Sequence, residues 1–131
     1  SLGAPISIDR GYFPSRSTGG ELLLWSLHST NGNMNPTDCV RLAANTLVEP
    51  KISSEDIGQN AAKKLKTLLD SGAATDFFLA DQLLIFMALL PGSSITTNKI
   101  TPHILANIYV IEQFLPVKFK VENSTITVQK N

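Results

Sequence analysis

The sequence is poor in the features that mark secreted and membrane proteins. Cys39 is the single cysteine among 131 residues, so the chain forms no internal disulfide and needs no oxidising compartment. The longest apolar run, residues 83–90, is far shorter than the roughly 18 residues that suggest a membrane helix. No charged-then-apolar signal segment opens the chain. These absences predict a cytoplasmic protein without a membrane partner.

An excess of charge of one sign is also missing. Eleven Lys and Arg residues balance eleven Asp and Glu residues, so the overall charge indicates no nucleic-acid-binding surface. A content of 43% hydrophobic and 17% charged residues is typical of globular proteins and excludes a disordered chain. The common phosphate-loop, dinucleotide, paired-cysteine and H-x-x-H patterns are absent. Any chemistry must therefore rest on isolated residues.

The first half of the chain carries mixed signals. Residues 6–8 read as a short strand, and the apolar run within residues 20–28 suits a buried strand better than a helix. Asn31-Gly32-Asn33 predicts a turn. The apolar spacing of residues 40–48 favours a helix by period alone.

The second half is more regular, and its capping residues and apolar periods predict three helices and a terminal hairpin. The first helix begins at residue 54, is capped by Ser53 or Ser54 and ends near Ser71-Gly72. The second helix covers 77–90 and is capped by Thr75; it is apolar nearly all round and is therefore predicted to be central and buried. A strand within 93–98 precedes a third helix over 102–115 behind Thr101-Pro102, and strands over 117–121 and 125–128 follow, with a turn near Asn123-Ser124. Together they predict an α+β fold with helices packed on a mostly antiparallel sheet.

Asp81-Gln82 stands out because two polar residues interrupt an apolar helix. Burying an unpaired carboxylate costs several kcal/mol, so Asp81 requires a partner or a water-lined cleft. Phe78 lies on the same helix face and makes that face a candidate nucleotide-contacting surface. The alternative, favoured by the residues alone, is that Asp81 caps a neighbouring loop and Phe78 belongs to the core.

His103 is the second candidate, at the second helical position behind Thr101-Pro102. First-turn N–H groups have no intrahelical partner, and the positive end of the helix dipole favours an anion such as phosphate. The same field favours a neutral, nucleophilic imidazole suited to nucleotidyl transfer. Asn107 lies one turn on, within reach of the ring or a ligand. The alternative is a surface histidine that merely follows a cap; His28 has no such context and reads as structural.

Three segments resemble one known family. Phe78-Leu79-Ala80-Asp81-Gln82-Leu83-Leu84, Pro102-His103-Ile104-Leu105-Ala106-Asn107-Ile108 and Glu112-Gln113-Phe114-Leu115-Pro116 are similar to the C-terminal part of RNA 3′-terminal phosphate cyclases. The spacing of Asp81 and His103 fits the family pattern, as does Ser71-Gly72-Ala73-Ala74. The resemblance is continuous from about residue 55 to 121. It implies a strand rather than a helix over residues 39–48, and we adopt the strand.

The resemblance also implies an architecture and a division of the chain. Family members are more than twice this length, with repeated units of two helices on a four-stranded sheet plus an inserted small domain. Residues 1–50 would be the end of that small domain with connecting strands, and residues 51–131 the C-terminal part of the catalytic domain. The N-terminal part of the same enzyme would be the missing partner.

The function implied by the resemblance is ATP-dependent conversion of an RNA 3′-phosphate end to a 2′,3′-cyclic phosphate through a histidinyl-AMP. His103 would be the nucleophile, Phe78 would stack on adenine, and Leu79, Ala80, Asp81 and Gln82 would complete this part of the ATP site. A divalent metal, Mg or Mn, would be held mainly outside this chain, which alone should be inactive. Two alternatives are a non-catalytic cyclase-like scaffold in ribosomal RNA maturation, whose relatives lack the histidine, and a generic α+β binding module, which would require His103 and Asp81 to lie far apart.

Overall fold

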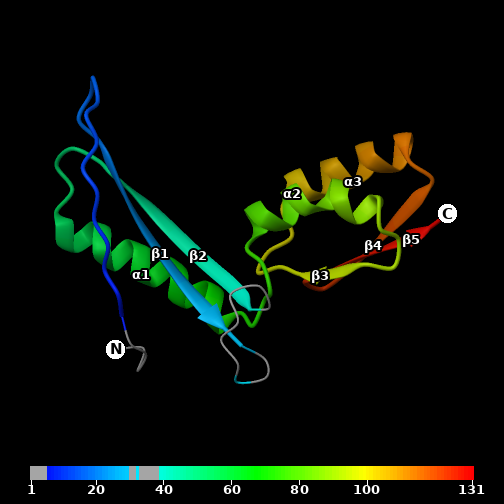
Figure 1. Cartoon of the computed structure of the whole chain (residues 1–131). Coiled ribbons are helices and arrows are strands. Elements are labelled where there is room, and N and C mark those ends of the chain that lie inside the picture. The colour runs from blue at the N-terminus through cyan, green and yellow to red at the C-terminus, as the bar shows by residue number, and fades with distance from the viewer. Residues whose placement is uncertain (1–5, 30–31, 33–38) are drawn as a thin grey trace.

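A computed structural model describes residues 6–29, Gly32 and residues 39–131. It shows two units in sequence, which Figure 1 displays side by side and which residues 71–76 connect. The first unit contains β1 (Gly20–His28), β2 (Val40–Val48) and α1 (Ser54–Asp70). The second contains α2 (Phe77–Ala88), β3 (Ser94–Thr96), α3 (Pro102–Phe114), β4 (Val117–Glu122) and β5 (Thr125–Lys130). The predicted α+β class is confirmed.

The first unit is an antiparallel strand pair covered on one face by α1. Leu24 opposes Ala44 across the pair, and both pack against the buried Leu65 and Leu68 of α1. Ser53 caps α1 by accepting a hydrogen bond from the Asp56 backbone N–H at 3.1 Å. The strand predicted over 20–28 and the helix beginning at residue 54 are therefore confirmed. The strand is not buried as expected, however, because α1 covers only one face of the pair and Leu23 and Trp25 are 56% and 62% exposed.

Residues 40–48 form a strand, as the resemblance implied, and the helix indicated by their apolar period is wrong. The reason is that every second residue, namely Leu42, Ala44 and Thr46, is at least partly buried on the face of the strand that α1 covers, and a spacing of two is the period of a strand. The strand expected at residues 6–8 is also wrong: this segment is irregular, and Ile6 and Ile8 are highly exposed. The predicted turn falls on Asn31 and Asn33, which lie outside the described residues.

The second unit places two helices on one face of a three-stranded antiparallel sheet (Figure 1), whose strand order is β3-β5-β4. A single parallel bridge between Thr75 and Thr97 extends the sheet beside β3. The predicted hairpin is confirmed, with Asn123 in the left-handed conformation that its turn requires. The core joins both helices to the sheet through the buried residues Ala80, Leu84, Met87, Ala88, Ile104, Ile108, Ile111, Val117, Ile126 and Val128.

Helix α2 differs from its prediction as a helix buried all round. Its inner face is fully buried at Ala80 and Leu84, but Phe78 and Phe86 are 66% and 61% exposed. The sheet and α3 cover only one side of α2, because the second unit has a single layer of helices. Its N-cap is Asp76, whose Oδ1 accepts from the Leu79 N–H at 2.7 Å. The expected cap, Thr75, instead joins the sheet. Strand β3 is shorter than expected, and α3 agrees closely with its prediction.

Candidate functional site

A small cavity lies where α2 and α3 begin. Its volume is about 230 Å³, and it is lined by Phe77, Phe78, Asp81, Thr101 and His103. Both helices run away from the cavity in the same direction (Figure 1), because β3 returns the chain between them. Two helix N-termini therefore converge here, each with first-turn N–H groups and a positive dipole end. The dipoles of these two helix N-termini favour a negatively charged ligand, whereas the Asp81 carboxylate on the same wall opposes one.

His103 is presented by a well-defined helix start. Thr101 is the N-cap, with its hydroxyl accepting from the Ile104 N–H at 3.3 Å, and Pro102 occupies the first helical turn. The neighbouring Ile104 is fully buried, while His103 itself is exposed. The cap and the buried Ile104 therefore fix the backbone, and the imidazole remains accessible from the cavity.

Asp81 is tied to α3 rather than to a loop. Asn107 donates from Nδ2 to Asp81 Oδ1 at 2.7 Å, which joins α3 to α2. Asp81 lines the same cavity as His103. The alternative in which Asp81 caps a neighbouring loop is thus not what the structure shows, and the two residues do not lie far apart.

Phe78 is at the surface and not in the core. It is 66% exposed and contributes to the cavity wall. The Phe77 and Phe78 ring centroids are 4.1 Å apart, with the planes tilted by 35°. An accessible aromatic face beside an anion-favouring pocket has the chemistry to stack on a nucleobase.

The other residues predicted for the ATP site lie differently. Ala80 is fully buried in the core, and Leu79 is 40% exposed. Gln82 is exposed and, like Leu79 and Ala80, is outside the set that lines the cavity. Sequence reasoning did not single out Phe77, and it treated Thr101 only as a cap. Phe77 lies one helical turn before Asp81, a spacing that would have placed it on the same face.

A second cavity of about 280 Å³ lies between the first unit and the connecting residues 72–74 and is mostly apolar. His28 lines it, and its Nε2 is 2.9 Å from Ser26 Oγ. Metal-ligating side chains are not clustered anywhere in the described ranges, where no three His, Cys, Asp or Glu residues come together. The same ranges contain no helix with the length and apolar character needed to cross a bilayer.

Comparison with known proteins agrees with the resemblance. A sequence model described as RNA 3′-terminal phosphate cyclase matches residues 6–121. The chain is similar to proteins named RNA 3′-terminal phosphate cyclase from three organisms. It is 38% identical to that of Pyrobaculum neutrophilum over 81% of this chain, 36% identical to that of Methanosarcina barkeri over 92% and 31% identical to that of Pyrococcus furiosus over 92%. The matches span only 28%, 32% and 32% of those proteins.

Proposed function

Because this chain belongs to the RNA 3′-terminal phosphate cyclase family, we propose that it supplies the nucleophile and part of the ATP site of a cytoplasmic ATP-dependent RNA 3′-terminal phosphate cyclase, an enzyme of the ligase class. The observation that carries the proposal is the cavity that His103, Asp81 and Phe78 share at two helix N-termini. The substrates would be ATP and an RNA with a 3′-phosphate end.

In the first step, His103 Nε2 attacks the α-phosphorus of ATP. A phosphorus–nitrogen bond forms as the bond to the bridging oxygen breaks, and pyrophosphate leaves. The two helix N-termini favour the charge that accumulates on the phosphoryl oxygens in the transition state. His103 suits this role because its ring is exposed at the cavity and the backbone that carries it is fixed by the Thr101 cap.

Binding of ATP rests on the aromatic wall and the carboxylate. Phe78 stacks on adenine, for which base–aromatic stacking contributes about 1–3 kcal/mol. Asp81 orients either the imidazole or a contact to the ribose or the phosphate. Leu79, Ala80 and Gln82 contribute through the backbone and the shape of this helical turn.

Two further transfers would complete the reaction. An oxygen of the RNA 3′-phosphate attacks the phosphorus of the histidine-bound AMP, which frees His103 and forms an RNA–AMP anhydride. The neighbouring 2′-hydroxyl then gives up its proton to water and attacks the 3′-phosphorus. The 2′,3′-cyclic phosphate closes as AMP leaves.

The site requires more protein than this chain. The cavity of about 230 Å³ is smaller than the roughly 300–1,000 Å³ of typical ligand pockets, although ATP is a large ligand. The described residues also offer no cluster of metal-ligating side chains, so we assign no step to a metal held by them. We infer that the remaining part of the enzyme completes the pocket and supplies the ligands for Mg or Mn, and that the chain alone is inactive.

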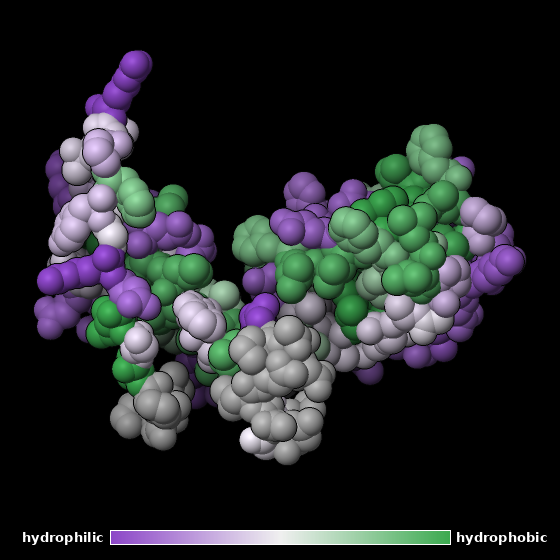
Figure 2. Space-filling view, viewed as in Figure 1, coloured by the Kyte–Doolittle hydropathy of each residue, from purple (hydrophilic) through white to green (hydrophobic). Residues whose placement is uncertain are grey.

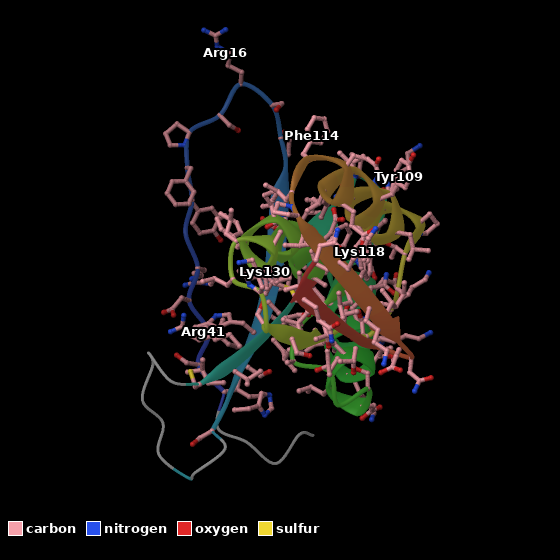
Figure 3. All side chains as sticks on the ribbon, turned by 90° about the vertical axis from the view of Figure 1, so that its right-hand side faces the viewer. Arg16, Arg41, Tyr109, Phe114, Lys118 and Lys130 are labelled. Carbon is pink, nitrogen blue, oxygen red and sulfur yellow. The ribbon has the colours of Figure 1, made fainter. Side chains whose placement is uncertain are left out.

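An apolar face marks where that remaining part would pack. Figure 2 shows hydrophobic residues gathered over α2 and α3, and Figure 3 shows Tyr109 and Phe114 extending outward from α3. Exposed apolar patches of this kind usually mark an interface. The relatives are about three times as long as this chain, so they contain the additional chain that such a face needs. The exposed members outside the cavity are Ile85, Phe86, Leu89, Leu90, Leu105, Tyr109, Val110 and Phe114.

The proposal can be tested by intact-mass measurement after incubation with ATP and Mg²⁺ or Mn²⁺. The chain is assayed alone and together with the remaining part of the Methanosarcina barkeri relative. Addition of one AMP only in the combined sample, and its loss with His103→Ala, is the expected result. A combined, folded sample that stays unmodified would contradict the proposal and favour the non-catalytic scaffold.

A further inference from the structure

The hydrogen bond from Asn107 to Asp81 is the one recorded side-chain hydrogen bond that joins α2 to α3 in the part of the chain that the structure describes. Its donor and acceptor are 26 residues apart and 2.7 Å from each other. We propose that Asn107 is a positioning residue for histidine adenylylation: its amide holds the Asp81 carboxylate on the cavity wall and leaves Oδ2 to face the imidazole or ATP. This inference rests on the proposed function.

The chemistry of the donor supports a positioning role. A carboxylate has two oxygens that accept hydrogen bonds, and the amide occupies only Oδ1. A Lys or Arg in this place would offset the charge of the carboxylate. A neutral amide orients Asp81 without adding a counter-charge. The ion pairs recorded among the described residues involve Asp70, Glu112 and Glu122. Asp81 is therefore held in one direction by a neutral donor.

The placement of Asn107 links Asp81 to His103 through one rigid element. His103 and Asn107 lie one turn apart on α3, so they share a helix face. Beneath them, the fully buried Ala80 and Ile104 belong to the core that packs α2 against α3. The distance between the helices is thus set by the core, and the direction of the carboxylate is set by the amide. A displacement of about 1 Å in such a site can lower a rate by about 100-fold.

A purely structural role predicts a different energetic pattern. Asn107 is exposed, and Asp81 is half-buried, so solvent weakens the contribution of their hydrogen bond to stability. The apolar contacts of Ala80, Leu84 and Ile108 already hold the helices together. Removing the amide should therefore change the free energy of unfolding little. If Asn107 positions Asp81, the same change should lower the rate of adenylylation strongly.

The test compares Asn107 variants in the chain combined with the remaining part of the Methanosarcina barkeri relative. Asn107→Ala removes the donor, and Asn107→Asp keeps the shape but places a second carboxylate against Asp81. Asn107→Gln retains an amide on a longer stem. Gln113→Ala is the matched control, because Gln113 is an exposed amide on α3 that bonds only the Tyr109 carbonyl in the described structure. The measurements are the AMP-adduct rate at saturating ATP, the KM for ATP and the urea midpoint.

We expect Asn107→Ala to lower the saturating rate by roughly 10- to 100-fold, with KM and the urea midpoint nearly unchanged. Asn107→Asp should lower the rate at least as much and should also lower the urea midpoint, because its carboxylate repels that of Asp81. Asn107→Gln should recover part of the rate, and Gln113→Ala should match wild type. Equal rates for wild type and Asn107→Ala, or a loss of rate that follows the loss of stability, would overturn the inference alone. Absence of any adduct in the folded wild-type sample would overturn both this inference and the proposed function.

Discussion

Replacing Glu112 should destabilise the second unit, and acid should have the same effect on the wild type. Glu112 lies on α3, and its side chain is only 15% exposed. Its Oε1 accepts from the Phe119 backbone N–H on the edge strand β4 at 2.7 Å, and its Oε2 accepts from Lys118 Nζ at 2.7 Å. The hydrogen bond from Lys118 has the largest effect in holding the pKa of Glu112 below its ordinary value of 4.5, and the bond from the Phe119 N–H adds to it. Partial burial acts in the opposite direction.

The direction of the pH effect follows from that pKa. A carboxyl group whose pKa is lowered by folding contributes stability that is fully present above the unfolded value of about 4.5. This contribution is lost as the pH falls through the lower pKa of the folded state. Glu112→Gln keeps an acceptor for Phe119 but loses the charge, and should cost about 1 kcal/mol. Glu112→Ala also leaves the Phe119 N–H without its acceptor and should cost about 2–3 kcal/mol.

The assay is urea unfolding followed by far-ultraviolet circular dichroism at pH 7, 5 and 3. Glu122→Gln is the control, because Glu122 pairs with Lys120 at 2.8 Å on the same hairpin but is 64% exposed; surface pairs of this kind contribute about 0–1 kcal/mol. Glu112→Gln should be less stable than wild type at pH 7 and lose less stability on acidification. Identical pH profiles for wild type and Glu112→Gln would refute the reasoning.

Three further perturbations test the site and its surroundings. Phe78→Ala should raise the KM for ATP of the combined enzyme by roughly 5- to 150-fold, the equivalent of about 1–3 kcal/mol of lost stacking. Phe78→Tyr should leave the KM unchanged, and an unchanged KM in the Ala variant would exclude stacking. Thr101→Ala should cost about 1 kcal/mol in urea unfolding, and Thr101→Ser should restore most of it; equal stability of both variants would show that the cap contributes nothing. The double variant Phe86→Ser, Leu90→Ser should raise the Kd for the remaining part of the relative at least about tenfold, as measured by calorimetry. Trp25→Ser on the first unit should leave this Kd unchanged, and an equal rise in Kd for both variants would place the interface elsewhere.

Local signals in the second half of the chain were sufficient to predict most of its elements. The alternation of apolar and polar residues over 117–128 matches a sheet with one face on the core and one in solvent. The Thr101-Pro102 pair marks the start of α3, which follows with a buried stripe at Ile104, Ile108 and Ile111. In these segments the residue period and the capping chemistry agree, so sequence alone determines the element.

Sequence reasoning failed where a segment depends on distant contacts. The apolar residues of 40–48 satisfy a helical period, yet their burial against α1 follows the period of a strand. The same dependence explains α2: its composition predicts burial on every side, but only its inner face meets α3 and the sheet. Tertiary packing thus overrides local pattern in both cases.

The candidate site was predictable in its residues but not in its connections. The polar interruption at Asp81 and the capped start of α3 identified the two helices that line the cavity. The hydrogen bond from Asn107 to Asp81 joins residues far apart in sequence, and no helical spacing rule relates two different helices. The residues alone favour a core position for Phe78, because an aromatic residue in an apolar helix usually packs inside, and only the resemblance predicted a nucleotide contact; Phe78 in fact lies on the uncovered side of α2.

Mapping the attached nucleotide tests the central claim most directly. The chain combined with the remaining part of the Methanosarcina barkeri relative is incubated with ATP and Mg²⁺, digested at neutral to alkaline pH, and sequenced by mass spectrometry. The account predicts one AMP on the imidazole of His103, lost on acid treatment as a phosphorus–nitrogen bond would be. AMP on another residue, or an adduct that persists in His103→Ala, would contradict it.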